Sequence, residues 1–378
     1  MSLNKTSNLI IFYLLLSLPF FFLIGSFFVN LIAISLSLYA VSWIIISRKY
    51  DLFLENYYIY FLPLFILFII SSIFSDYKIQ AFENSFSYLI QILFFISLPI
   101  ILLTDNKKLL ISKIVFFIVI LICIDLWFQK FFHINITGYP TQQAGRLTSF
   151  FKDEQIPGSV IFKMSPFVIY YLFSPKKNKI IFNHKFYIIL FIYFSILITG
   201  ERAASILSTL LIIFLIVFNL KKINKKQLFY YLSFFIIIFI ILINLKNSVI
   251  KERITYTLND QIHNNVYLAL YKNSYLIFNN NILLGTGPQT YRYVCPKTSY
   301  IDENSKKSCS THPHNYVFEL LSDAGMFAPI FFIFSLLFFL RKNLQLIKNN
   351  FLKSLIISYT ILFFFPLIPT GSFFTSFH

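Results

Sequence analysis

The stretch Phe27–Ser47 reads FFVNLIAISLSLYAVSWIIIS and contains no charged residue. About 20 apolar residues suffice for a helix to cross a hydrocarbon core of roughly 30 Å, because each residue rises about 1.5 Å. About eleven such segments occur along the chain, which predicts an all-α polytopic membrane protein. They are approximately Leu9–Ile24, Phe27–Ser47, Tyr58–Phe74, Phe86–Leu103, Leu109–Phe128, Pro157–Phe173, Phe186–Thr199, Ala203–Leu220, Leu228–Leu245, Tyr316–Leu340 and Ser354–Pro369.

The composition excludes an ordinary soluble domain. Of the 378 residues, 57% are hydrophobic and 12% are charged, whereas soluble domains carry about 25% charged residues. The net charge of +17 would suit nucleic acid, but the basic residues lie between the apolar segments and no folded soluble region combines them with aromatic residues. We therefore expect membrane lipid as a partner and no nucleic acid.

The basic residues also predict the orientation. With the N-terminus inside, 18 Lys and Arg fall on the cytoplasmic side and six fall outside, apart from one long external loop, as the positive-inside rule requires. The first segment is expected to be a true helix and not a signal peptide, because a second span follows Gly25 and Ser26 without a cleavage site. The expected segments are helices 1–5 (1–128), an external loop (129–156), helices 6–9 (157–245), a large external loop (246–315) and helices 10–11 (316–378).

The large external loop holds most of the polar chemistry. Cys295 and Cys309 lie on this side, where an oxidising compartment would favour a disulfide, although two free thiols are the alternative. No Cys-x-x-Cys pair, His-Glu-x-x-His helix or carboxylate cluster is present, so we expect neither a metal site nor another cofactor.

A polar stripe begins at the end of this loop. His314 and Gly325 are eleven residues apart, close to three helical turns, and Asn315, Glu319 and Ser322 lie beside them. Such residues at the mouth of a Phe-rich span predict an external cavity. The alternative is structural: Ser310 and Thr311 cap the helix, and His314 and Asn315 lie at the headgroup level.

Arginines on the external side indicate an anion site. Arg202 lies between two spans, and Arg146 and Arg292 lie on neighbouring external loops. A guanidinium stays charged and can bind a phosphate through two parallel hydrogen bonds. The alternative for Arg202 is a membrane anchor or a surface pair with Glu201. Gly285 and Gly287 lie in a loop turn without the strand-to-helix context of a phosphate-binding motif, so no nucleotide site is expected.

These residues together resemble the bacterial O-antigen ligase family, whose domain is shared with O-antigen polymerases. The motifs are His314-Asn315 followed by nine residues and Gly325, Gly285-Thr286-Gly287-Pro288, the turn Thr199–Ala203 and the loop Arg146–Ser159. The resemblance extends from about Arg146 onward. It implies a twelfth, closing helix, which we do not find in the sequence.

The resemblance implies transfer of a glycan from undecaprenyl pyrophosphate to a sugar hydroxyl of lipid A-core or of another glycan, without a metal. The enzyme would lie in the bacterial inner membrane, with a cytoplasmic N-terminus and a periplasmic active site. It assigns His314 as the base or orienting group for the acceptor, with His312 the weaker alternative, and Arg202 as the pyrophosphate ligand, supported by Arg292 or Arg253. We further expect substrate contacts from Arg146, His312, Asn315 and Glu319.

Three other functions compete with the ligase. An O-antigen polymerase would use the same donor on the same side of the membrane, and one sequence does not separate the two acceptors. A transporter of the lipid-linked glycan should show internal repeats and charges near the midplane, and neither is evident. A purely structural subunit would not require His, Arg and Glu at the mouths of the helices.

Overall fold

The computed structural model describes residues 5–48, 58–102, 104–142, 145–173, 182–219, 266–299, 308–365 and 368–374, and the single residues 233, 236, 240 and 301. The described residues form helices and connecting loops without a strand; one isolated bridge joins Ile134 and Pro140. The predicted all-α polytopic membrane fold is confirmed.

The chain divides into two compact units, each built from separated parts of the sequence. Unit 1 comprises Met1–Leu103, Asn265–Lys348 and Pro366–His378, and unit 2 comprises Thr104–Asn264 and Asn349–Phe365. Each unit therefore combines early and late segments of the chain.

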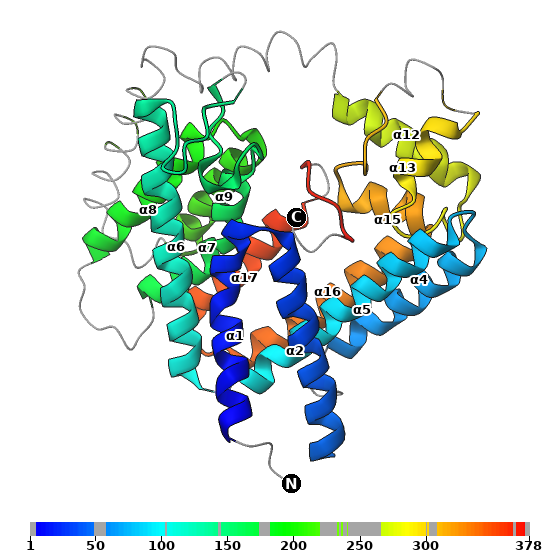
Figure 1. Cartoon of the computed structure of the whole chain (residues 1–378), viewed down its shortest axis with the longest axis horizontal. Coiled ribbons are helices and arrows are strands. Elements are labelled where there is room, and N and C mark those ends of the chain that lie inside the picture. The colour runs from blue at the N-terminus through cyan, green and yellow to red at the C-terminus, as the bar shows by residue number, and fades with distance from the viewer. Residues whose placement is uncertain are drawn as a thin grey trace. The chain divides into compact units, whose positions relative to one another are not determined.

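Unit 1 contains long apolar helices and a group of shorter helices near the predicted site (Figure 1). Helix α2 begins after Gly25 and ends at Ser47, before Arg48, whose left-handed backbone (φ 52°) caps the helix. The elements of unit 1 are α1 (Lys5–Ile24), α2 (Ser26–Ser47), η1 (Tyr58–Phe61), α4 (Leu62–Phe74), α5 (Lys78–Ile101), α12 (Val266–Asn280), α13 (Tyr291–Val294), η5 (Cys295–Lys297), α15 (Tyr316–Ala324) and α16 (Phe327–Leu346).

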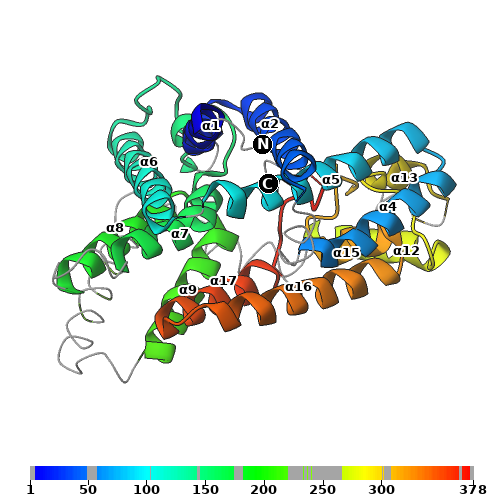
Figure 2. The ribbon, with the colours of Figure 1, turned by 90° about the horizontal axis from the view of Figure 1, so that it is seen from below.

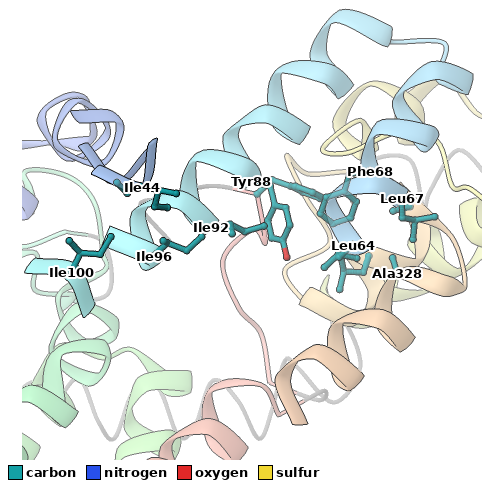
Figure 3. Packing of buried hydrophobic residues seen from close by; sticks show 13 residues of the cluster. Ile44, Leu64, Leu67, Phe68, Tyr88, Ile92, Ile96, Ile100 and Ala328 are labelled. Atoms are coloured by element: carbon teal, nitrogen blue, oxygen red, sulfur yellow. The ribbon is translucent and has the colours of Figure 1, made fainter. Parts of the chain in front are cut away.

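One face of α5 organises the apolar core of this unit. Tyr88, Ile92, Ile96 and Ile100 follow each other at intervals of four residues, so they lie on one side of the helix. This face packs against residues of α2, α4 and α16, including Ile44, Leu64, Phe68 and Ala328 (Figure 3). The rings of Phe68 and Tyr88 meet edge to face at 5.0 Å. The core thereby joins α4 and α5 to α16, the helix that follows the predicted site.

Unit 2 consists of α6 (Asp105–Phe132), η3 (Ser149–Phe151), α7 (Pro157–Phe173), α8 (Phe182–Ile198), α9 (Arg202–Asn219) and α17 (Asn350–Phe363). The Thr104 side chain caps α6 by accepting a hydrogen bond from the Lys107 amide. Helix α17 packs beside α9 (Figure 2), and the core between α7, α9 and α17 contains Phe162, Leu211 and Leu362.

The predicted spans agree with the helices except in four places. The expected span Ser354–Pro369 is wrong at its end, because α17 ends at Phe363. Helix α5 begins at Lys78, eight residues before the predicted Phe86. The expected span Tyr316–Leu340 is wrong as a single helix, because Gly325 (φ 79°) separates α15 from α16. The predicted span Leu228–Leu245 lies almost entirely outside the described residues. Among described helices, four are long and apolar enough to cross a membrane: α2, α5, α6 and α16; five shorter apolar helices accompany them.

The predicted large loop also contains regular structure. Its described part, from residue 266 onward, includes the fifteen-residue helix α12 and the short elements α13 and η5. Tyr271 of α12 stacks on Phe318 of α15, with ring centroids 4.7 Å apart. This part of the segment therefore packs directly on the helix that begins the predicted polar stripe.

Candidate functional site

The two glycine motifs of the sequence meet in one backbone crossing, formed by residues 282–287 and 322–326. The Thr286 amide donates to the Ser322 carbonyl (3.0 Å), the Gly287 amide donates to the Asp323 carbonyl (2.8 Å), and the Met326 amide donates to the Ile282 carbonyl (2.8 Å). A Cβ on Gly285 would lie 2.4 Å from the Ala324 nitrogen, and one on Gly325 would lie 2.2 Å from the Leu283 oxygen. Only glycine fits at both positions, because backbone atoms occupy the space and φ is positive.

Serines of α4 hold this crossing from the other side. The Ser71 hydroxyl donates to the Leu284 carbonyl at 2.6 Å, and its oxygen lies 3.0 Å from the Asp323 carbonyl. The hydroxyl of Ser75, which follows α4, donates to the Thr286 carbonyl at 2.6 Å. Our sequence analysis missed these two residues. Three serines at the end of an otherwise apolar span, Ser71, Ser72 and Ser75, were the available signal.

Asp323 fixes the turn that follows the crossing. Its carboxylate accepts hydrogen bonds from the Gln289 amide (2.8 Å) and the Ser322 hydroxyl (3.3 Å). This turn leads into α13, where Tyr291 is completely buried and Arg292 is half-buried. The Gly285–Pro288 motif and Asp323 therefore determine where Arg292 lies.

The two predicted histidines lie against each other. Their ring centroids are 4.0 Å apart and tilted by 47°. His312 is buried, with Nδ1 3.0 Å from the Thr311 hydroxyl. His314 is half-buried, with Nε2 3.4 Å from the Ser310 hydroxyl and its ring edge to face with Tyr267 at 5.9 Å. The more accessible of the two histidines is His314, which begins the predicted His-Asn motif.

Asn315 caps the helix that follows. Its side-chain oxygen accepts hydrogen bonds from the Val317 and Phe318 amides, at 3.0 and 3.3 Å. The alternative in which Ser310 and Thr311 cap this helix is wrong, because α15 begins at Tyr316 and Asn315 occupies the cap position. Asn315 was predicted to contact the substrate, but its side-chain oxygen is used as the N-terminal cap of α15.

Glu319 is completely buried and binds a distant part of the chain. Its carboxylate accepts hydrogen bonds from the Ser372 hydroxyl at 2.5 Å and the Phe373 amide at 2.7 Å. The positive charge of Arg292 also acts on this carboxylate. Arg292 and Glu319, two predicted substrate residues, are therefore close enough for their opposite charges to interact.

The disulfide Cys295–Cys309 links the end of α13 to the segment that leads to the histidines. The Cα atoms are 5.9 Å apart and the two residues are separated by 14 positions. Cys295 is completely buried in an apolar cluster with Leu270, Ile277 and Tyr291. The bridge thereby ties the segment that carries Arg292 to the segment that carries His312 and His314.

In unit 2, the predicted turn Thr199–Ala203 contacts the start of α7. The Glu201 carboxylate accepts hydrogen bonds from the Gly158 amide (2.6 Å), the Ser159 amide (3.0 Å) and the Ser159 hydroxyl (2.5 Å). Glu201 is 8% exposed, and this burial raises its pKa above the ordinary value, which the hydrogen bonds from Ser159 and Gly158 and the charge of Arg146 partly offset. The alternative of a surface pair between Glu201 and Arg202 does not describe a carboxylate this deeply buried.

Basic side chains surround this carboxylate. Arg146 and Lys163 both interact electrostatically with Glu201, and the Arg146 guanidinium donates to the Gln155 carbonyl at 3.2 Å. Arg202 is half-buried and is the first residue of α9. Lys163, inside α7, was counted as an external charge in the sequence analysis but not recognised as a site residue; a lysine within an apolar segment was the available signal.

The loop that carries Arg146 is built on buried polar side chains of α6. Asp125 accepts hydrogen bonds from the Ile136 amide (2.7 Å) and the Ser149 hydroxyl (2.6 Å). Gln129 accepts from the Thr148 and Ser149 amides, both at 2.9 Å. All of these polar groups are internally satisfied, so the described part of the loop 129–156 has a defined conformation.

The structure thus divides the predicted site residues between its units. Unit 1 brings together His312, His314, Asn315, Glu319 and Arg292, and unit 2 contains Arg146 and Arg202. Arg253 lies outside the described residues. No group of three or more His, Cys, Asp or Glu side chains able to hold a metal ion is found among the residues that the structure describes.

Comparison with known proteins gives one family. None of the curated proteins matches the chain. Residues 186–333 match the family model described as O-antigen ligase, and this range includes Arg202, the backbone crossing and both histidines. The match confirms the resemblance that the sequence motifs indicated: this membrane protein carries a domain of the O-antigen ligase family, which includes the polymerases.

Proposed function

We propose that this protein transfers a glycan from undecaprenyl pyrophosphate to a sugar hydroxyl of lipid A-core on the periplasmic face of the bacterial inner membrane. The observation that carries the proposal is the pair of packed imidazoles at the start of α15, with His314 at the family position inside the matched region. In the reaction, the acceptor oxygen forms a bond to the anomeric carbon while the bond between that carbon and the pyrophosphate oxygen breaks. The hydroxyl proton leaves the acceptor, and undecaprenyl pyrophosphate departs as an anion.

The acceptor hydroxyl needs a group that orients it and takes its proton. A neutral imidazole has a reference pKa of about 6.5, which suits a base near neutral pH. His314 is the better placed of the two histidines, because it is half-buried whereas His312 is buried. We assign the acceptor-facing role to His314 and a packing role to His312. Glu319 and Asn315 support this loop, since their oxygens bind protein groups.

The leaving pyrophosphate needs positive charge and hydrogen-bond donors. Arg202 lies in the first turn of α9, where the helix dipole disfavours a cation by roughly 0.3–1 kcal/mol but attracts an anion. The Arg202 guanidinium stays charged and can bind a phosphate through two parallel hydrogen bonds. Arg146 and Lys163 add positive charge near Glu201, the residue that precedes Arg202. We assign Arg202 to the pyrophosphate, with Arg146, which belongs to the same unit, in support.

The orientation follows from charge and redox chemistry. The excess of basic residues on one side of the predicted spans supports a cytoplasmic N-terminus. The Cys295–Cys309 disulfide belongs to an oxidising compartment, which supports a periplasmic site.

The test is transfer of a defined undecaprenyl-pyrophosphate glycan in proteoliposomes, with purified lipid A-core as acceptor. We expect product with the wild type and a loss of at least about 100-fold in kcat/KM for His314→Ala, the typical contribution of a general base. Arg202→Ala should lose activity, and Arg202→Lys should recover only part of it, because lysine cannot form the two parallel hydrogen bonds.

Two substitutions serve as controls. His133→Ala removes an exposed histidine from unit 2, and Arg341→Ala removes an exposed arginine from α16; both should retain activity. Retained transfer in His314→Ala would refute its assignment as base. Extension of the lipid-linked glycan without lipid A-core would show that the protein is a polymerase, and absence of any transfer by the wild type would refute the proposed function.

A further inference from the structure

A short segment far from the histidines in sequence runs directly beside them. Residues 368–374, here called the strap, contact three residues at the start of α15 (Figure 1). The Thr370 amide donates to the His314 carbonyl at 2.8 Å. The Asn315 side chain donates to the Ile368 carbonyl at 3.5 Å. Glu319 accepts from Ser372 and Phe373. The strap is therefore hydrogen-bonded to His314, to the helix cap Asn315 and to Glu319 in the first turn of α15.

The far end of the strap is anchored in the core of unit 1. Phe374 is 1% exposed and meets Phe68 edge to face at 5.0 Å. Phe373 stacks on Tyr88 at 5.8 Å and meets Tyr316 and Phe332 at 5.9 and 5.2 Å. These rings belong to α4, α5, α15 and α16. The strap is thus anchored in the apolar core of unit 1, and its hydrogen bonds can restrain the backbone at His314.

His314 needs such support because of its backbone. Its φ of 56° lies in the left-handed region, which is unfavourable for an L-residue other than glycine. Residues in this region persist where surrounding contacts determine them. The hydrogen bond from Thr370 to the His314 carbonyl is a contact of this kind. Removing the strap would allow the His314 peptide to relax and the ring to turn.

We propose that Glu319 is a positioning residue for the transfer reaction: it fastens the strap through Ser372 and Phe373, and the strap holds the His314 imidazole in its reactive orientation. This inference rests on the proposed function for its catalytic consequence. Glu319 itself is completely buried and its carboxylate oxygens are used by the strap, so it acts through His314. A misplacement of about 1 Å at a reacting group can reduce a rate by about 100-fold.

The experiment combines kinetics with chemical labelling of the histidine. Glu319→Ala should lower kcat for glycan transfer by about 10- to 100-fold with KM for the donor changed by less than about threefold, because positioning affects the reacting geometry and not donor binding. Glu319→Gln keeps one acceptor oxygen and should recover part of kcat. Ser372→Ala removes one of the two strap bonds and should show a smaller loss.

Labelling gives a readout that does not require activity. Diethyl pyrocarbonate modifies accessible imidazoles, and mass spectrometry can compare His314 with the exposed His133 of unit 2 in the same sample. We expect His314 to react at least about threefold faster in Glu319→Ala, since the loop opens more often. Ser335→Ala, which removes a buried hydroxyl bonded to the Tyr60 carbonyl in the same unit, should change neither kcat nor labelling.

The outcomes separate the two proposals. Lower kcat with faster His314 labelling, partly restored by glutamine, supports the positioning role. Unchanged kcat and labelling in both Glu319→Ala and Ser372→Ala would overturn it, as would a loss of kcat without any change at His314. If Glu319→Ala does not fold, Ser372→Ala carries the test, because it removes a single hydroxyl. If the wild type transfers no glycan, the proposed function fails, and the labelling still decides whether the strap holds His314.

Discussion

Replacing Gly325 by alanine tests the backbone crossing at the family motif. Gly325 has φ 79° and ψ −174°, a region that is essentially restricted to glycine and costs other residues about 1–3 kcal/mol. The new Cβ would lie 2.2 Å from the Leu283 oxygen and 2.4 Å from its carbonyl carbon. These are backbone atoms and cannot rotate away, so the two segments must separate.

The expected loss adds this backbone term to an overpacking term of about 1–3 kcal/mol. The sum is a local destabilisation of about 2–6 kcal/mol. The amides of Thr286, Gly287 and Met326 are hydrogen-bonded across the crossing and should exchange with solvent deuterium more often. A loss of about 2 kcal/mol corresponds to roughly 30-fold faster exchange through local opening.

The assay is hydrogen–deuterium exchange with mass spectrometry in detergent micelles, with peptides covering residues 282–287 and 322–326. Gly138→Ala is the matched control, because Gly138 also has a positive φ (91°) but no heavy atom lies within 4 Å of the position of its Cβ. This control should cost only the backbone term of about 1–2 kcal/mol, confined to its own loop in unit 2. Exchange at the crossing that stays within about threefold of the wild type in Gly325→Ala would refute the reasoning.

Three further predictions concern single contacts. Ser75→Ala should destabilise the crossing by about 1 kcal/mol, since the Thr286 carbonyl loses its donor; exchange at Gly287 reports this, and equal exchange would contradict it. Cys295→Ser with Cys309→Ser should reduce stability by about 3 kcal/mol, as expected for a loop of this length; a thermal-denaturation midpoint unchanged from the wild type would contradict it. Burial raises the pKa of Glu201 above 4.5, so the stability linked to this group is present at low pH and is lost as the pH rises through the folded-state pKa. The midpoint of the wild type should therefore fall relative to Glu201→Gln as the pH is raised above 4.5, and parallel pH profiles would refute this assignment.

Much of the fold was predictable because hydrophobicity and helix length are local properties. The apolar segments Phe27–Ser47 and Pro157–Phe173 correspond closely to α2 and α7. The break at Gly325 was not predicted. Hydropathy continues through it, and the reason for the break is a contact with Leu283, more than 40 residues earlier. The start of α5 was missed for a related reason, since its first turns are polar.

The candidate site was predictable where a residue type carries its own chemistry. The sequence identified His314 by its motif and Arg202 by its charge, and it left Cys295 and Cys309 open between a bridge and two thiols. It gave no sign that Glu319 binds Ser372, because a hydrogen bond between positions 53 residues apart has no local pattern. The role of Glu201 at the start of α7 was hidden in the same way.

The sequence by itself determined that this is an all-helical membrane protein with polar chemistry gathered at the ends of apolar helices, and its motifs indicated the O-antigen ligase family. These properties depend on composition, length and short spacing. Only the tertiary structure decided that the two glycine motifs form one crossing, that Ser71 and Ser75 hold it, and that the strap lies beside His314. The physical reason is that such contacts join backbone atoms and small polar groups from distant segments, and their partners are defined only once the helices have packed.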